Sequence, residues 1–322
     1  MIFTTLPDNY APITAPIIYG FELDEERAFV DVNIVDVANE RVIGVKRLYN
    51  VQRAEIDVVP YLNRCFVFNP IEGGTSLADA KGLYAAVAIE VDGCRSDKRH
   101  FSHYPVEEGV ATLFRTALRR QDIARNESDY VVIYSPRGGR VEIELYADSA
   151  LVDVLELDID ESPGLSVLKI LPSDFVKESE SMILAVSIDC IDYYMSYQIV
   201  PTPERSKRLM WVDMDGVMQF YTFPICRSRR FRATKQRVET DKGVVIASCE
   251  SESSLTLVSD YETVNDVERV SEIIAAKQVW LDRGKSATKV DVLSAESMVK
   301  YGGALNMVQI EIRSQNGKEA GL

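Results

Sequence analysis

The stretch Ala28-Phe29-Val30-Asp31-Val32-Asn33-Ile34 places four apolar side chains, those of Ala28, Val30, Val32 and Ile34, on one face of an extended chain. This two-residue period is typical of a strand buried on one side. The alternation returns in residues 141–146 and 152–160, and glycine and proline turns separate the segments. The sequence therefore predicts a mainly β protein made of many short strands.

The length of 322 residues exceeds what one hydrophobic core usually organises. The spacing of strands and turns predicts tandem immunoglobulin-like β-sandwich modules followed by a small α+β module. Residues 1–128 are expected to form the immunoglobulin-like sandwich with a connecting helix, 129–203 the second sandwich, and 204–322 the α+β module. Pro201-Thr202-Pro203 is typical of a stiff hinge between the last two.

Two segments have the spacing of helices instead. Apolar residues between Val110 and Leu118 recur at three- and four-residue steps, which predicts the connecting helix. From about Thr263 to Ala276, Val267, Val270 and Ile273 show the same period, and Asp266 lies in the first turn, where the helix dipole favours acids.

Charge is distributed unevenly along the chain, whose net charge is −14. Residues 204–322 hold 18 Lys and Arg against 17 Asp and Glu, a balance of +1, so residues 1–203 hold 18 against 33, a balance of −15. The overall acidity opposes general binding to nucleic acid or to an anionic membrane. The asymmetry favours ordered association of the acidic part of one copy with the third module of another, so a homo-oligomer is expected.

Targeting and metal signals are weak. The sequence lacks the apolar run of roughly 20 residues that a membrane-spanning helix needs, and Met1–Pro16 does not resemble a signal peptide. Five cysteines without a C-x-x-C pair favour free thiols in a reducing compartment. His100-Phe-Ser-His103 has no partner pair with zinc-ligand spacing, so we expect neither metal nor cofactor.

Catalytic signals are also weak. The nucleophile-elbow, phosphate-loop and dinucleotide-binding motifs do not occur, and His100 and His103 are the only histidines. We expect a protein that is not an enzyme. A glycosidase needs only two carboxylates at a set distance, and remains a further alternative because sequence cannot pair them.

The acidic group Glu156, Asp158, Asp160 and Glu161 could offer oxygen ligands to calcium. It alternates with apolar residues, however, and no loop is present to wrap an ion. The polar face of a strand is the favoured interpretation.

One basic run is the best candidate interaction site. It holds Arg227, Arg229, Arg230, Arg232, Lys235 and Arg237, interleaved with Phe231. Such a run could bind phosphates while the ring stacks on a base. In a strongly acidic chain, the favoured interpretation is a solvent-facing strand whose arginines pair with acidic modules of the same chain or of a neighbouring subunit.

The segment from Leu209 to Phe223 is the most distinctive in the chain. Asp215-Gly216 is a strong hairpin signal between two runs that carry Trp211, Tyr221 and Phe223. We expect this hairpin to be a buried structural element of the third module without a catalytic role.

This hairpin resembles a Trp-Asx-x-x-Gly hairpin ending in Tyr-x-Phe in uncharacterised virion and tail-associated structural proteins of phages and prophages of gut Bacteroidetes. The resemblance continues in residues 275–281, which end in Val-Trp-Leu, and in the closing strand 308–312. Residues 56–62 show a weaker similarity. It covers about the last third of the chain. Asp213 stands where Asn is expected, and the family's double glycine is reduced to Gly216.

The resemblance implies a non-catalytic structural subunit of a phage particle, in a tail, neck or baseplate-type assembly. Its expected partners are other virion subunits, and its expected location is the virion, assembled in the cytoplasm of the bacterial host. The alternative is a carbohydrate-binding or adhesive β-sandwich protein that uses exposed aromatics such as Tyr193 and Tyr194.

Overall fold

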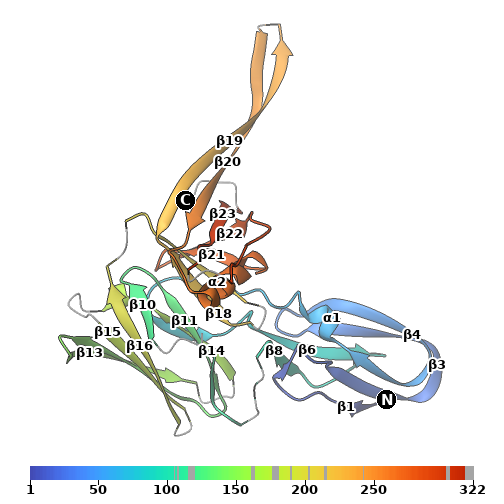
Figure 1. Ribbon diagram of the computed structural model, residues 1–322. Helices are drawn as coiled ribbons and strands as arrows, with labels where there is room; N and C mark the ends of the chain where they lie inside the picture. The colour runs from blue at the N-terminus through green and yellow to red at the C-terminus, as the bar shows by residue number, and fades with distance from the viewer. Residues whose placement is uncertain are drawn as a thin grey trace.

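The computed structural model describes residues 1–104, 106, 109–114, 120–160, 164–175, 181–188, 191–201, 204–213, 216–241, 243–301 and 305–315. Three β-rich modules meet at a common centre, and one long hairpin projects away from them (Figure 1). The predicted mainly β fold of sandwich-type modules with a small helix-bearing module is confirmed.

The first module is one curved sheet of seven described strands around its own core. The long strand β3 pairs with β1 through its first residues and with β6 through its last, while β4 follows it along most of its length. Tyr19, Phe21, Val32 and Ile34 are fully buried beneath it, and Val30 is buried as well, so the alternation marks the core face from Val30 to Ile34 as predicted. Ala28, expected on the same face, is exposed instead. The strands are β1 (Ile2–Thr5), β2 (Ala11–Pro12), β3 (Ile18–Asp36), β4 (Arg41–Asp57), β6 (Tyr84–Val91), β7 (Cys94–Arg95) and β8 (Arg99–Ser102), with the short helix α1 (Val59–Leu62) after β4.

The second module is a sandwich of a four-stranded and a five-stranded sheet, as described, packed on a shared core. The smaller sheet has the order β5-β14-β11-β9 and the larger β10-β16-β15-β12-β13. Its elements are β5 (Ser76–Asp79), β9 (Thr112–Phe114), β10 (Arg120–Ala124), β11 (Asp129–Ser135), β12 (Gly139–Ala147), β13 (Ala150–Ile159), β14 (Gly164–Ile170), η1 (Pro172–Asp174), β15 (Ser181–Ile188) and β16 (Ile191–Val200).

The third module packs one helix against a sheet of seven described strands in the order β18-β17-β21-β22-β23-β20-β19. Thr263 caps the helix by accepting a hydrogen bond from the Asp266 amide at 3.4 Å, and Val267, Val270 and Ile273 are fully buried, as predicted. The elements are β17 (Lys207–Val212), β18 (Met218–Phe223), β19 (Ile225–Thr240), β20 (Gly243–Val258), α2 (Val264–Ser271), η2 (Glu272–Ile274), β21 (Val279–Asp282), β22 (Ala287–Val292) and β23 (Gln309–Ser314).

The structure differs from the sequence-based expectation around residues 76–124. Thr112–Phe114 is strand β9, so the connecting helix predicted over Val110–Leu118 is wrong in its first part, and residues 115–119 lie outside the described residues. Strands β5, β9 and β10 all pair with strands of the second sandwich, although they precede the expected boundary near Asp129. Pairing partners distant in sequence leave no trace in a local alternation pattern, which explains both differences.

An aromatic cluster holds the three modules together at the centre. Phe68 comes from the first module, Tyr130 from the second, and Phe220 and Trp280 from the third. The Tyr130 and Phe220 rings stack with centroids 6.0 Å apart, and Phe68 meets both Tyr130 and Trp280 edge-on. Such offset and edge-to-face contacts add to the area that the rings bury.

A polar joint at the same centre links the second and third modules. Arg208 on β17 donates from Nε to the Ser128 carbonyl at 3.0 Å, and its Nη1 lies 3.4 Å from a Glu127 oxygen. Asp282 at the end of β21 accepts from the Ser128 amide at 2.6 Å and from its hydroxyl at 2.9 Å. All four residues are buried. The predicted hinge 201–203 is described only at Pro201.

No helix in the described ranges is long and apolar enough to cross a membrane. The four described cysteines, Cys65, Cys94, Cys226 and Cys249, are free thiols, and Cys190 lies outside the described residues.

Candidate interaction surface

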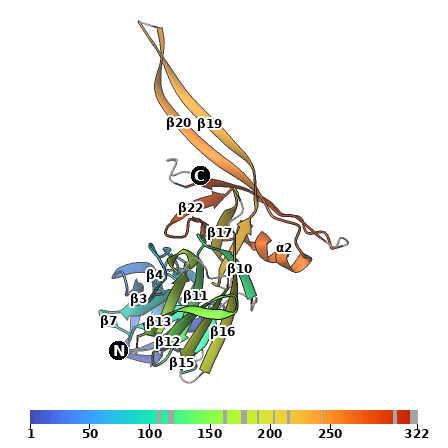
Figure 2. The ribbon, with the colours of Figure 1, turned by 90° about the vertical axis from the view of Figure 1, so that its left-hand side faces the viewer.

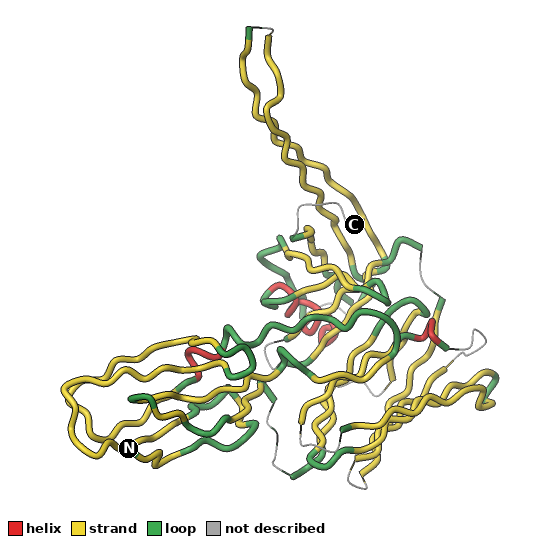
Figure 3. Tube along the Cα trace, turned by 180° about the vertical axis from the view of Figure 1, so that it is seen from behind, coloured by secondary structure: helices red, strands yellow, loops and turns green. Residues whose placement is uncertain are grey.

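Strands β19 and β20 form an arm that extends beyond the body of the molecule. We call residues 231–253 the arm, because the third strand β23 pairs with β20 only from Ser254 to Val258. Beyond that point, the ribbon continues for about ten residue pairs, or about 30 Å at 3.3 Å per residue. Figures 1 and 2 show it projecting away from all three modules, and in Figure 3 it leaves the body as two strands alone.

The predicted basic run lies on β19 at the base and along the arm, and all six of its charged residues are exposed. Arg227 donates to the Gln309 side chain at 2.8 Å, and Arg230 lies 3.4 Å from Glu311. Arg232 lies 3.9 Å from Glu252, a carboxylate that also contacts Arg313 at 3.1 Å. These contacts tie the base of the arm to β20 and β23.

The opposite face of β19 presents the other cations. Arg229 stacks over the Phe231 ring at 4.7 Å, in the geometry of a cation–π contact. Lys235 shares this face by the two-residue period of the strand. Beyond a bulge between Gln236 and Arg237, the strand reaches its tip.

Four exposed apolar side chains, which we call the apolar tip, lie beside the polar turn residues Glu239, Thr240 and Asp241 at the end of the arm, and they were not predicted from the sequence. Val238, Val244, Val245 and Ile246 are between 45% and 64% exposed. The run Val244-Val245-Ile246 next to Gly243 was the available signal, but an apolar run of this kind is indistinguishable from a buried strand before the fold is known. A two-stranded ribbon without a core of its own is at best marginally stable in water, so contacts within one copy contribute little to the stability of the arm.

Other candidate residues are dispersed by the fold. His100 lies beside Asn9, with 3.1 Å between Nδ1 and the Asn9 oxygen, and burial lowers its pKa. His103 packs against the Phe66 ring at 4.5 Å between centroids. Within the described residues, no group of three or more His, Cys, Asp and Glu side chains is placed to hold a metal ion.

The acidic group predicted as a strand face lies on and just after β13. Glu156 forms an ion pair with Arg140 of the neighbouring strand β12. Asp158 and Asp160 are exposed, and Glu161 lies outside the described residues.

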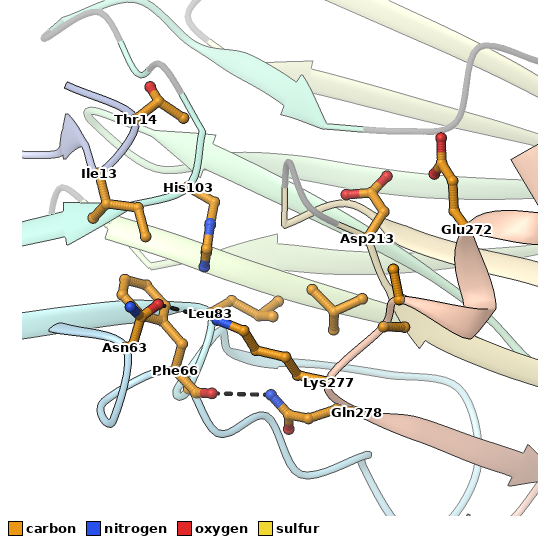
Figure 4. A pocket seen from close by; sticks show the side chains of 14 residues that line it. Ile13, Thr14, Asn63, Phe66, Leu83, His103, Asp213, Glu272, Lys277 and Gln278 are labelled. Atoms are coloured by element: carbon orange, nitrogen blue, oxygen red, sulfur yellow. Dashed lines mark hydrogen bonds between the residues drawn. The ribbon is translucent and has the colours of Figure 1, made fainter. Parts of the chain in front are cut away.

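A cavity of about 370 Å³ lies between the first and third modules (Figure 4). Lys277 donates to Asn63 at 3.1 Å across it, and Gln278 donates to the Phe66 carbonyl at 2.9 Å. Asp213 accepts from the Val217 amide at 2.7 Å and from Gln219 at 2.8 Å, both within its own hairpin. These polar groups already bond to one another across the module boundary or within the hairpin turn. The arm, which lies outside the modules, is therefore the stronger candidate for contact with another molecule.

No family model matches the sequence, and no curated protein matches it. Among solved structures, the chain is similar to the native conformation of E. coli alpha-2-macroglobulin, with 9% sequence identity and a TM-score of 0.21 over 80% of this chain and 21% of that one. The chain spans about a fifth of the length of that protein.

Proposed function

We propose that the protein is a non-catalytic structural subunit of a phage particle, in a tail, neck or baseplate-type assembly, and that the arm makes its contacts with neighbouring subunits. The observation that carries the proposal is the arm itself, a ribbon of about ten residue pairs with no third strand and an apolar tip. Exposed apolar surface on an element that has no core gains stability when a partner covers it.

Two further features support an assembly role. The central aromatic cluster and the polar joint connect three modules, so the arm projects from a broad, well-packed base. The sequence of the third module, which carries the arm, is also the part that resembles virion and tail-associated proteins. In this role the protein is assembled into the virion in the cytoplasm of its host and binds other virion subunits.

Mass spectrometry of purified particles tests the proposal directly. Particles are induced from a strain that carries the gene and are banded in a density gradient. We expect peptides of this chain to co-purify with intact particles in a constant ratio to the major structural proteins. Absence of the chain from intact particles, with the chain recovered at the cell surface, would contradict the proposal.

The carbohydrate-binding alternative depends on the pair Tyr193 and Tyr194. Tyr194 is exposed on the larger sheet of the second module, whereas Tyr193 is half-buried and donates its hydroxyl to the Ala111 carbonyl at 2.8 Å. The pair therefore presents one exposed aromatic ring, that of Tyr194. Saturable binding on a glycan array that Tyr194→Ala abolishes would favour this alternative.

A further inference from the structure

The edge strands of the molecule differ strongly in length and charge. Among the described edges, those formed by β1, β2, β5, β7, β9, β10 and β18 have six residues or fewer. Strand β4 is long, but it carries Arg41, Lys46, Arg47 and Arg53. Strand β13 has ten residues and pairs with β12 on one side. It is long and acidic, and no other described strand outside the arm has an open edge of ten residues without a Lys or Arg. Within the arm, the open side of β20 is also acidic, with Glu250 and Glu252.

Strand β13 changes from apolar to acidic along its length. It begins with the exposed side chains of Leu151, Val152 and Val154. It ends at the acidic side chains of Glu156 and Asp158, and Asp160 follows directly. No basic residue occurs from 150 to 160.

Strand β19 changes in the opposite order along the chain, from cationic to apolar. Its first part and middle carry the six cations from Arg227 to Arg237, and Val238 near its end belongs to the apolar tip. The one acidic residue in the strand is Glu239. An antiparallel alignment of β19 with β13 places Val238, the one residue of the apolar tip on β19, beside Leu151 and Val152, and it places Arg229, Arg230 and Arg232 near Glu156, Asp158 and Asp160. Both trends match in this orientation and neither matches in the parallel one.

We infer that the arm adds to the β13 edge of a second copy of this chain as an antiparallel strand. Main-chain hydrogen bonds supply the attraction in this mode of recognition, and side chains on either face select the partner. Like charges oppose the pairing of β13 with another β13, and of β19 with another β19, whereas β19 and β13 attract each other. The inference rests on the proposed function, because it names the partner of the arm.

The contact must join different copies. Within one copy the arm points away from the body, and β13 lies in the second module on the other side of the centre (Figure 1). A contact between two different patches is heterologous, so repeated copies build a ring or an open filament rather than a closed twofold dimer. Both outcomes fit a subunit of a particle.

Charge reversal in the full-length chain tests the inference. One variant carries Arg229→Glu and Lys235→Glu on β19, a second carries Asp158→Lys and Asp160→Lys beside the β13 edge, and a third carries all four changes. A matched control, Arg53→Glu with Arg95→Glu, reverses two exposed cations of the first module. Circular dichroism and thermal melting establish that each variant is folded, and sedimentation velocity measures self-association.

We expect each two-residue reversal to weaken self-association by about tenfold or more, since opposed charges across an interface disfavour it. The variant with all four changes again places opposite charges on the two strands, with the signs exchanged. Its association constant should therefore return to within a few-fold of that of the parent. The control should associate as the parent does. Unchanged association in the β13 variant, or no recovery in the variant with all four changes, would overturn the inference.

The outcome is separable from that of the proposed function. A chain that is present in particles but insensitive to these reversals overturns the β13 contact and leaves the structural role standing. A chain whose self-association is restored in the variant with all four changes, but which is absent from particles, overturns the structural role and leaves the β13 contact standing. If the β19 reversal instead abolishes micromolar binding to DNA and leaves self-association unchanged, the arm is a nucleic-acid surface and the inference is wrong.

Discussion

At the scale of single residues, Trp211 shows what the hairpin of the third module contributes. Its side chain is fully buried, with Phe223 equally buried in the same core. The sequence predicted this burial from the aromatic pattern around Asp215-Gly216. An indole of this size leaves a large cavity when it is removed.

Trp211→Ala should therefore lower the free energy of unfolding by about 3–5 kcal/mol. Urea titration followed by circular dichroism measures the change in the full chain. Tyr261→Ala, which truncates a 62% exposed ring of the same module, is the matched control and should change stability by less than about 0.5 kcal/mol. An equal, small effect of both substitutions would show that the indole is not part of the core.

Gly216 connects the same hairpin to the first module. Its φ is +81°, in the left-handed region, and a Cβ placed there would lie 2.4 Å from the His103 Cβ. The Tyr104 hydroxyl also donates to its carbonyl. The glycine is thus needed both for its own conformation and for the close approach of another module.

Gly216→Ala should destabilise the protein more than Gly93→Ala does. Gly93 has a similar φ of +78° with no atom near the added Cβ, so it isolates the backbone cost of about 1–2 kcal/mol. The excess loss at Gly216 measures the clash with His103. Thermal melting of the two variants gives the comparison, and equal losses would contradict the role of Gly216 as a module contact.

Asp129 gives a prediction about pH. The carboxyl is fully buried at the start of β11, and burial raises its pKa above the ordinary value of an aspartate. The folded state therefore holds this proton more tightly than the unfolded state does. The stability that this group contributes is present below its unfolded pKa, and is lost as the pH rises through the folded one.

Asp129→Asn removes this titration. Its stability relative to the parent should increase as the pH rises from about 4 towards 7, because the parent pays for ionising a buried carboxyl and the variant does not. Urea unfolding across that range measures the difference, with the exposed Asp8→Asn as the control. Parallel stability curves for the parent and Asp129→Asn would contradict the prediction.

At the scale of elements, residue patterns predict the type of an element better than its partners. The alternation in residues 28–34 and the helical spacing in 263–276 correspond to β3 and to α2 with η2. The apolar spacing between Val110 and Leu118 predicted a helix, yet Thr112–Phe114 pairs with β11. In a segment this short, three- and four-residue apolar steps also fit a partly buried strand, and long-range pairing decides between them.

The candidate site was predictable in the same partial way. The basic run was predicted as a solvent-facing strand, and β19 is an exposed strand that begins with it. Its extension past the last strand of the sheet depends on where β23 ends, at Ser314 opposite the arm base, and nothing near Arg232 or Val244 encodes that position.

Removal of the arm tests whether it is independent of the fold. Replacing residues 234–250 by Asn-Gly joins Ala233 to Ser251, a cross-strand pair, through a two-residue hairpin turn. The described residues among those deleted are exposed and belong to no core cluster, so the melting temperature should stay within about 2 °C of the parent. A large loss of stability in dilute solution would mean that the arm belongs to the fold.

At the scale of the whole molecule, three modules meet around aromatic rings and buried polar groups, while the one long ribbon stays outside. Net charge divides the chain in a related way: it is −15 in residues 1–203 and +1 in residues 204–322, which include the third module and its arm. In a molecule built in this way the three modules pack against one another within one copy, whereas the arm extends beyond the last strand that supports it. The proposed role in assembly with other copies rests on this contrast.

Sedimentation velocity of the full chain and of the arm-deleted chain, at low and high salt, is the most direct test of this role. We predict that the full chain forms oligomers whose size increases with protein concentration and decreases with salt, and that the arm-deleted chain remains a folded monomer. A full chain that is monomeric at high concentration under both conditions, or oligomers that persist without the arm, would contradict it.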